Sequence, residues 1–353
     1  MNDRTKYPFE GSVSRRSFLA GMTGAAAAAV MPMGAMLNPR YSKASGHTVM
    51  NMQLGWIVTN GQLGEVVASE LGYYAEENLS LEITAGGPNV DGIANVYAER
   101  AQLGQVSSSP SIMMARAAGL PIKCIAAGYQ EHPFTYFSLK DNPVNEPKDL
   151  IGKKVGTNGT ARILLQALLA QHDIPESEVE VLVIGSNMAP LITGQVDVVT
   201  GWQTNASALR TLGDERVDMR LWDAGVRLYA NPYYATDDAI ENDHDQLEGF
   251  IRATARGWGW AYENREKAVE ILVNRYPNLN LENELRAVDA IMDYVFTGTS
   301  KANGWGSMEK TKWQDQIDTY AALGQFEGSV PTVEDIMTDS VLKATSSSRP
   351  KFG

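Results

Sequence analysis

The chain has 353 residues, 44% of them hydrophobic, which is enough for sizeable cores in two domains of ordinary size. The formal net charge is −12, with a net +4 in residues 1–44 and −16 in the remainder, and this balance argues against nucleic acid or an anionic membrane surface as a partner. A single cysteine, Cys124, excludes an intramolecular disulfide and a cysteine-based metal cluster, and four scattered histidines offer no HExxH-like pair, so no structural metal is expected.

The amino terminus has the pattern of an export signal. Residues 14–19, SRRSFL, place twin arginines before an Ala-rich, mildly apolar run at 20–37, and Ala44 ends a small-residue cleavage motif. This order predicts a twin-arginine signal peptide over 1–44, the alternative being a disordered terminus with a chance arginine pair. No later stretch approaches the roughly 18 apolar residues of a membrane span. We therefore expect a periplasmic mature chain, cleaved near Ala44 and not inserted in the membrane.

The first half of the remaining chain alternates between strand and helix patterns. Apolar residues recur with period 2 in the predicted strands and with helical spacing in the predicted helices. The strands are expected at 52–58, 79–84, 102–108, 122–127 and 134–139, and the helices at 62–77, 90–100 and 111–118.

A polar, Pro-rich break at 141–147 precedes a second series of the same kind. It begins with a strand ending at Val155 and a helix through 171, and the chain is mainly helical after 245. Further strands are expected at 179–184, 196–200, 219–222 and 227–229, and helices up to 192 and at 206–212, 246–263, 267–275, 282–294 and 308–323, before a polar tail at 346–353.

Two similar βαβ series predict an α/β protein of two lobes. Each lobe is expected to hold a mixed or parallel sheet flanked by helices, and two crossing segments would hinge the lobes around a cleft. Lobe 1 is predicted over 48–140 plus 235–345, and lobe 2 over 141–234.

The turn after the strand at 155 is the strongest polar candidate for the cleft. Asn158, Gly159 and Thr160 lie where a strand gives way to a helix, so unpaired backbone N–H groups of the helix start point over the sheet edge. Such a turn suits an anionic group. It lacks a local lysine, however, and has no P-loop signature, which favours a neutral polar contact.

Four segments carry a resemblance to a known family. They are LGYYAEENLSLEI, AAGLPIKCIAAGYQEHPFTYFSLKD, EPKDLIGKKVGTNGTA and VLVIGSNMAPLITGQVDVVTGW, and together they span roughly residues 50 to 235. In order and spacing the chain resembles the solute-binding proteins of ABC importers, in the family named for thiamine-pyrimidine synthase. One departure is at 100–104, RAQLG, where the family has an acidic residue before the third strand.

The resemblance implies a periplasmic-binding-protein (Venus flytrap) fold that captures a small solute for an ABC permease in the inner membrane. Family members take up thiamine pyrimidine precursors, riboflavin, sulfonates, nitrate or aromatic acids. We expect a monomer with no cofactor.

Lobe 1 candidates come from the turns that follow its strands. Trp56 could stack on a flat ring, at about 0.5–1.5 kcal/mol beyond area burial, or could pack in the lobe core. Polar groups could bind ligand or serve as turn formers, helix caps and structural groups. These candidates are Asn60, Gln62, Ser107, Ser108, Tyr129 and His132.

Lobe 2 supplies Trp202 and Gln203, which follow the predicted strand at 196–200 and mirror Trp56. Tyr229 lies in the second crossing segment, where hinge packing is the equal alternative. Glu65 and Asp197 are interpreted as structural.

Two tryptophans at strand ends with mainly neutral donors indicate a planar, weakly charged heteroaromatic ligand. A thiamine pyrimidine precursor therefore fits better than nitrate or a simple sulfonate, which would call for more basic residues. Riboflavin and an aromatic acid remain alternatives, as does a periplasmic sensor with the same fold.

An enzyme is the less favoured hypothesis. The family's fungal relatives make the thiamine pyrimidine with a pyridoxal-phosphate-binding lysine, a reactive histidine and a Cys-rich iron-site motif. One cysteine in this chain excludes that iron site, so we expect no catalytic residues.

Overall fold

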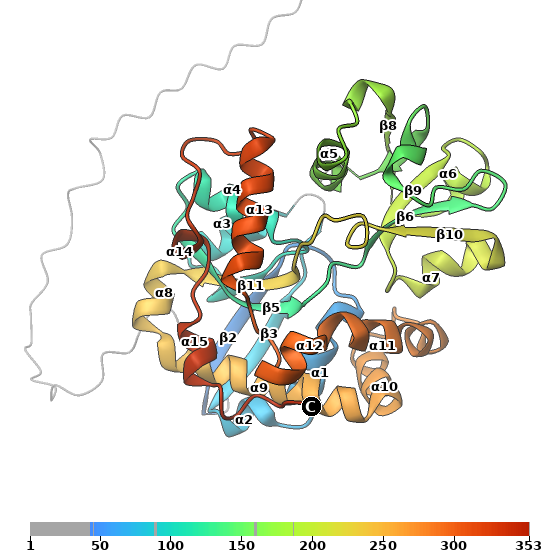
Figure 1. Ribbon diagram of the computed structural model, residues 1–353. Coiled ribbons are helices and arrows are strands. Elements are labelled where there is room, and N and C mark those ends of the chain that lie inside the picture. Colours follow the sequence, from blue (N-terminus) through green and yellow to red (C-terminus); the bar gives the residue numbers. More distant parts are fainter. Residues whose placement is uncertain (1–42, 45, 88–89, 159–160, 186, 353) are drawn as a thin grey trace, which may run out of the picture. The chain divides into compact units, whose positions relative to one another are not determined.

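The computed structural model describes residues 43–44, 46–87, 90–158, 161–185 and 187–352, which form two β-sheets with their own helices (Figure 1). The first sheet has the order β1-β2-β4-β11-β5, with β3 also beside β2. β2 is parallel to β3 and β4, whereas β11 is antiparallel to both β4 and β5. The strands are β1 Lys43–Ala44, β2 His47–Leu54, β3 Leu79–Thr84, β4 Leu103–Gln105, β5 Ile122–Tyr129 and β11 Ala230–Thr236.

The second sheet has the order β10-β6-β9-β7-β8. β7 is parallel to β8 and β9, and β6 is antiparallel to β9 and β10. The strands are β6 Phe134–Leu139, β7 Lys154–Thr157, β8 Glu180–Val183, β9 Val198–Trp202 and β10 Arg216–Arg220. Both sheets are thus mixed, which is one of the two arrangements that the sequence predicted.

The helices fill the connections between the strands and then dominate the last third of the described chain. None of those described is both long and apolar enough to cross a membrane. The bounds are η1 Asn60–Gln62, α1 Leu63–Glu70, α2 Tyr73–Glu76, α3 Gly92–Tyr97, α4 Pro110–Ala117, η2 Pro147–Leu150, α5 Arg162–Gln171, η4 Glu176–Glu178, α6 Ala189–Ile192, α7 Ala206–Leu209, η5 Arg210–Glu215, α8 Asp237–Asn242, α9 His244–Glu263, α10 Arg265–Arg275, α11 Leu281–Val295, α12 Gly298–Asn303, α13 Lys310–Ala322, α14 Val333–Ile336 and α15 Ser340–Ala344.

Helices cover both faces of the first sheet. Neighbouring residues of a strand point to opposite faces, and β11 shows this with two tyrosines. The ring of Tyr233 lies 5.6 Å from that of Phe250 on α9. Tyr234 belongs to the other apolar cluster, which also contains Ile317 of α13. Figure 1 shows α9 and α13 on opposite sides of this sheet.

Glycines let α1 and α9 approach closely. A Cβ on Gly64 would lie 2.2 Å from Cδ1 of Trp258, and one on Gly257 would lie 2.0 Å from the carbonyl oxygen of Gly64. Because both distances are far below van der Waals contact, a side chain at Gly64 would displace the Trp258 indole, and one at Gly257 would displace the backbone of α1. The indole of Trp258 is therefore held directly over the first turn of α1.

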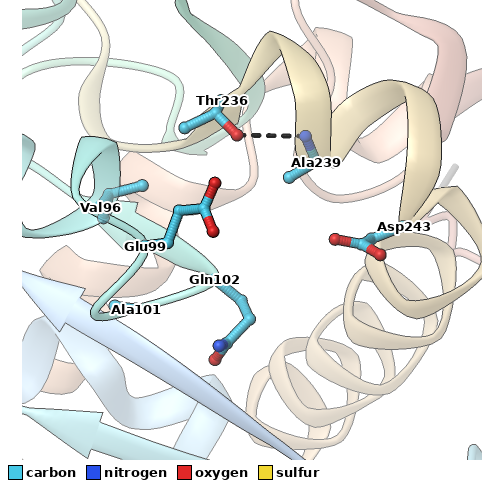
Figure 2. Close-up of a pocket in the computed structure, with 7 residues that line it drawn as sticks. All are labelled: Val96, Glu99, Ala101, Gln102, Thr236, Ala239 and Asp243. Atoms are coloured by element: carbon cyan, nitrogen blue, oxygen red, sulfur yellow. Dashed lines mark hydrogen bonds between the residues drawn. The ribbon is translucent and has the colours of Figure 1, made fainter. Parts of the chain in front are cut away.

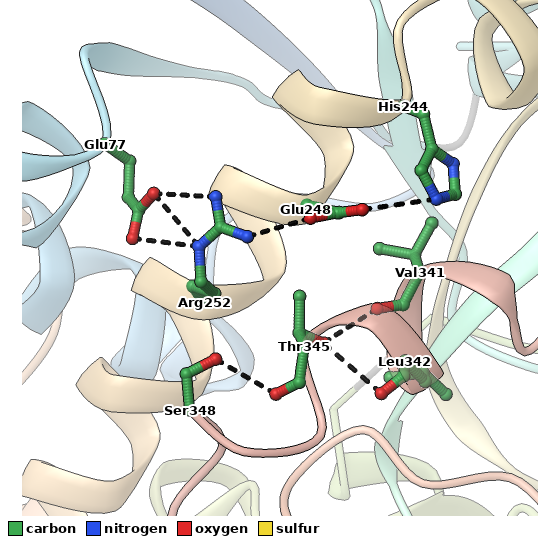
Figure 3. A network of polar contacts seen from close by, with 8 residues as sticks. All are labelled: Glu77, His244, Glu248, Arg252, Val341, Leu342, Thr345 and Ser348. Carbon is green, nitrogen blue, oxygen red and sulfur yellow. Dashed lines mark hydrogen bonds and ion pairs between the residues drawn. The ribbon is translucent and has the colours of Figure 1, made fainter.

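A polar network on α9 ties this helix to the end of α2 (Figure 3). Arg252 donates to both carboxylate oxygens of Glu77, at 2.9 to 3.1 Å, and to Glu248 at 3.0 Å. Glu248 also pairs with His244 one turn earlier, at 3.3 Å. The hydrogen bonds to Glu77 raise the pKa of Arg252, because they stabilise its charged form.

The expected polar tail at 346–353 is instead anchored in its described part. The buried guanidinium of Arg349 donates to the carbonyl oxygens of Trp305, at 2.6 Å, and Leu342, at 3.1 Å. The ring of Phe352 lies 4.4 Å from that of Tyr262. Reading these residues as a tail was wrong because one arginine and one phenylalanine give no periodic signal.

The strand at 52–58 was placed too late, since β2 begins at His47 and ends at Leu54. The helix expected at 62–77 is broken at Gly72, whose φ of 76° ends α1 and starts α2. No strand forms at 227–229, and β11 follows directly instead. Pro232 in the middle of β11 hid this strand, because proline is ordinarily excluded from central strands.

The predicted lobe boundaries at 141 and 234 do not match the sheets. β6 lies before the first boundary yet belongs to the second sheet, and β11 spans the second boundary yet belongs to the first. The segments that cross between the sheets are therefore 130–133 and 221–229. β6 was assigned to lobe 1 because the Pro-rich break at 141–147 follows it.

Candidate functional site

The turn that follows β2 reaches the second sheet. The side-chain amide of Asn60 donates to the carbonyl oxygen of Thr204 at 3.0 Å, just past β9, and to Glu284 of α11 at 2.7 Å. Thr59 caps this turn, accepting from the Gly61 amide at 3.1 Å. Asn60 is buried, so the bond to Thr204 is a protected link between the two sheets.

Gln62 faces inward rather than toward a cleft. Its oxygen accepts from the Thr59 backbone amide at 2.9 Å, which completes a capping box, and its amide donates to Gln105 of β4 at 2.7 Å. With 3% of its surface exposed, it supports the turn and offers little surface to a ligand. The turn-forming alternative therefore describes Gln62 better than direct contact does.

Aromatic rings gather where the first crossing segment meets the end of β9. The ring of Trp202 lies 5.3 Å from that of His132 and 6.2 Å from that of Tyr129. Tyr294 of α11 stacks on Tyr129 at 6.4 Å, with the two planes only 4° apart. We refer to Tyr129, His132, Trp202 and Tyr294 as the junction cluster. The half-buried Trp202 is contributed by the second sheet's β9, and Tyr129 by the first sheet's β5.

Gln203 binds groups from both sides of this junction. Its backbone amide donates to the Pro133 carbonyl at 3.0 Å, and its side-chain amide donates to Asp218 of β10 at 2.9 Å. Its side-chain oxygen accepts from the Tyr294 hydroxyl. All these contacts are made inside the protein, which gives Gln203 a positioning role in this conformation.

His132 is neutral in this setting. Its Nδ1 accepts from the backbone amide of Phe134 at 3.2 Å, so Nε2 carries the proton and donates to Oγ of Ser108 at 2.6 Å. Burial lowers the pKa of His132 to about 3. A group that stays uncharged above about pH 4 orients Ser108 and adds no charge to the site.

The two candidate tyrosines are fully buried. Tyr229 accepts from the Glu309 amide at 2.9 Å and packs 5.5 Å from Trp313, which matches the hinge-packing alternative. The Tyr129 hydroxyl has no hydrogen-bond partner among the described residues. Burial raises the pKa of both phenols.

On the second sheet, Asn158 follows β7 and is half-buried. Its side-chain oxygen accepts from the amide of Ala161, the residue before α5, at 2.8 Å. Gly159 and Thr160 lie outside the described residues.

Trp56 lies two residues after the end of β2 and is half-buried. The Gly86 amide donates to its carbonyl oxygen at 2.8 Å, whereas the ring contacts of Trp202 are with Tyr129 and His132. Ser107 is also half-buried, and its backbone carbonyl accepts from the backbone amide of Asn231 at 3.2 Å. Trp56 and Trp202 therefore do not form a pair in this conformation.

Sequence reasoning missed Glu284 and Tyr294, which α11 brings to the junction from far along the chain. It also treated Glu65 as merely structural. An available signal was the position of Glu65 within the apolar stripe of α1, between Leu63 and Val66, because a carboxylate on a buried face needs specific partners.

Two cavities differ in what they can hold. The one drawn in Figure 2, between α3 and α8, has a volume of about 10 Å³, room for a single water. The other measures about 590 Å³, which falls in the range of small-molecule sites. It lies beside the junction and is lined by Gln203, which follows β9, and by residues of α7, η5, β10 and α11, including Arg210, Arg216 and Arg286.

No three His, Cys, Asp or Glu side chains in the described ranges are placed to hold a metal ion. Cys124 is fully buried, and burial raises the pKa of its thiol, which keeps it protonated.

The chain resembles both binding proteins and a synthase. The formylaminopyrimidine-binding protein of Halalkalibacterium halodurans is 24% identical over 258 residues, covering 71% of this chain and 78% of that protein. The 4-amino-5-hydroxymethyl-2-methylpyrimidine phosphate synthase of Legionella pneumophila is 26% identical over 240 residues, covering 65% and 74%. The riboflavin-binding protein RibY of Chloroflexus aurantiacus is 28% identical over 221 residues, covering 61% and 63%.

Among solved structures, the periplasmic aliphatic sulphonate binding protein SsuA from Escherichia coli superimposes with a TM-score of 0.65 at 14% identity, over 82% of this chain and 92% of that one. This likeness establishes the fold. The family described as NMT1/THI5 like matches residues 60–268, which is more than half of the chain. The protein therefore belongs to the NMT1/THI5-like family and has the two-lobed periplasmic-binding-protein fold.

Proposed function

We propose that the protein is the solute-binding component of an ABC importer, and that it captures a small planar solute and delivers it to a permease in the inner membrane. The best candidate for the solute is a thiamine pyrimidine precursor. The observation that supports this proposal best is the junction cluster, in which Trp202 of the second sheet meets Tyr129 of the first sheet and His132 of the first crossing segment. Rings and amides from both sheets can enclose a flat heteroaromatic molecule and satisfy its ring nitrogens.

The electrostatics of the junction favour a weakly charged ligand. His132 is neutral, and the amides of Asn60 and Gln203, which in this conformation donate to Thr204, Glu284 and Asp218, add no charge to the junction. The nearby Arg220 is already paired with Glu131 at 2.7 Å. A sulfonate or nitrate would need an unpaired cation, whereas a pyrimidine needs amide groups. The three arginines that line the 590 Å³ cavity lie outside the junction cluster. The name of the Halalkalibacterium halodurans relative supports the same choice.

Binding would proceed through closure of the lobes. Ligand would dock on one lobe, and the link between Asn60 and Thr204 would favour the closed arrangement that a permease recognises. Small-angle scattering tests this step, because the radius of gyration should fall when ligand is added. Identical curves with and without ligand contradict the closure mechanism.

Calorimetry against a panel of pyrimidines, flavins, sulfonates and aromatic acids tests the ligand class. We expect a response to an aminopyrimidine, lost or weakened in Trp202→Ala. Trp260→Ala is the matched control, since this half-buried indole lies on α9, outside the junction cluster. If only riboflavin or only a sulfonate binds, that compound replaces the pyrimidine as the proposed ligand. No response to any compound of the panel would count against solute binding.

A sensor that signals to a receptor would use the same fold. A permease and an ATPase encoded beside this gene favour transport, and their absence favours sensing.

Pyrimidine synthesis is the second candidate, because the Legionella pneumophila relative is named as a synthase. Purified protein incubated with pyridoxal phosphate and iron should release no pyrimidine product. Detection of that product by mass spectrometry would establish an enzyme instead.

We further propose export by the twin-arginine route to the periplasm. The segment that carries Arg15 and Arg16 lies outside the described residues. Replacing both arginines with lysine should leave the protein in the cytoplasmic fraction, with the untouched signal as control. Unchanged export of the double variant argues for another route.

A further inference from the structure

A buried carboxylate lies beneath the turn that links the two sheets. Glu65, in the first turn of α1, is completely buried. One of its oxygens, Oε1, accepts from the Tyr233 hydroxyl and from the Gln105 side-chain amide, the latter at 3.3 Å. Its second oxygen has no hydrogen-bond partner among the described residues. An ionisable group is costly to bury, so its retention points to a role beyond packing.

The hydrogen bonds between the turn and this carboxylate all have the same direction, with the donor on the side of the turn and the acceptor on the side of Glu65. Gln105 donates to Glu65 with its nitrogen and accepts with its oxygen from Gln62, at 2.7 Å. Gln62 in turn accepts from the Thr59 backbone amide at 2.9 Å. Because Glu65 can only accept when it is ionised, it dictates which way the Gln105 amide faces, and Gln105 dictates the same for Gln62.

We refer to the hydrogen bonds that join Glu65 through Gln105 and Gln62 to Thr59 as the relay, and it ends at the contact between the sheets. Thr59 and Gln62 enclose the turn that carries Asn60, and Asn60 donates to the Thr204 carbonyl beyond β9. A change in the acceptor strength at Glu65 is thus transmitted through two buried amides to the residue that touches the second sheet.

We propose that Glu65 is a positioning residue that sets the geometry of the Thr59–Gln62 turn, and through it of the Asn60 contact between the lobes. This proposal rests on the proposed solute-binding function only for its consequence, namely that closure of the lobes around a ligand depends on whether Glu65 is ionised. The positioning itself is independent of any ligand.

The surroundings make this carboxylate titratable near neutral pH. Burial raises the pKa of Glu65 to about 7, opposed in part by the hydrogen bond from Tyr233. Its ionised form makes the stronger, charge-assisted bonds. The relay should therefore be tight above pH 7 and loose below it.

Other groups face Glu65 from each neighbouring element. The phenols interacting with it are Tyr74 of α2, Tyr129 of β5, Tyr233 of β11 and Tyr276 after α10, and α9 contributes the indole of Trp258. Burial raises the pKa of all four phenols, so they stay neutral. A further acid beside the turn is Glu284, which accepts from Asn60 and whose pKa burial also raises.

Amide hydrogen exchange at Thr59 tests the proposal without ligand, because this amide donates directly to Gln62. After correction for the intrinsic pH dependence, protection of the wild-type amide should rise about fivefold from pH 5.5 to pH 8, as expected when one hydrogen bond gains roughly 1 kcal/mol. In Glu65→Gln, which keeps the shape but cannot ionise, protection should not depend on pH.

The control is Glu77→Gln, which removes a carboxylate from the same lobe at the Arg252 pair and should keep the wild-type response. A wild-type amide without a pH response overturns the proposal, and so does a response that survives in Glu65→Gln. Survival of the response would assign it to Glu284. Once a ligand is known, its dissociation constant should follow the same pH profile in the wild type only. A failed ligand search would leave the exchange result standing.

Discussion

The free energy of unfolding should carry a pH signature of Glu65 that Glu65→Gln removes. The carboxyl is buried completely in α1, and its pKa rises from an ordinary 4.5 to about 7 because burial disfavours the charged form. The folded protein therefore holds this proton more tightly than the unfolded chain does. By linkage, stability is fully present below pH 4.5 and falls as the pH rises through 7.

The magnitude follows from the two pKa values. One pKa step corresponds to about 1.4 kcal/mol, so between pH 5 and pH 8 the wild type should lose about 2.5 kcal/mol relative to the variant. Any hydrogen bond that the substituted amide fails to make shifts the two curves by a constant. It leaves their difference in slope unchanged.

Urea denaturation of both proteins at pH 5, 6, 7 and 8 provides the measurement. The unfolding free energy of the wild type minus that of the variant should decrease as the pH rises, most steeply between pH 5 and pH 7. Titration of Glu284 is common to both proteins and cancels. If this difference does not change with pH, or increases with pH, the burial argument for Glu65 is refuted.

Three further outcomes test individual contacts. Asn60→Ala should cost about 1–3 kcal/mol of unfolding free energy, because Glu284 is left buried without its donor. Small-angle scattering should show a larger mean radius of gyration for this variant. An unchanged radius would mean that Asn60 does not contribute to lobe closure. Trp56→Ala and Trp202→Ala should each weaken ligand binding about two- to tenfold in calorimetry while circular dichroism stays native. Normal binding by both variants would exclude stacking of these two rings on the ligand. Arg349→Ala should lower the thermal midpoint by several degrees through loss of its buried carbonyl contacts, whereas Lys351→Ala, exposed on the same segment, should not.

Much of the architecture could be predicted because it depends on local periodicity. The helices expected at 246–263 and 282–294 correspond to α9 and α11, whose apolar stripes are long and regular. β11 escaped prediction because it has a proline at 232 and is stabilised by partners on both sides, far away in the chain. Pairing across such a separation leaves no local pattern.

The site was predictable only in part for a related reason. The polar turns after strands are visible in sequence, and the turn carrying Asn60 does meet the other sheet. Which way a side chain faces is decided by tertiary packing: Gln62 turns inward to Gln105, and Tyr229 packs on Trp313. Tyr294 joins the junction from a helix whose pattern predicts only a core face.

The late return of β11 also governs the order in which the protein can assemble. β4 and β5 are not paired with each other, since β11 lies between them. While the ribosome is making the chain, the first sheet stays in two pieces until residues 230–236 have emerged. All strands of the second sheet lie within 134–220, so that sheet is complete earlier. The second sheet can thus form first, and the first sheet is completed only after the chain has passed through both crossing segments.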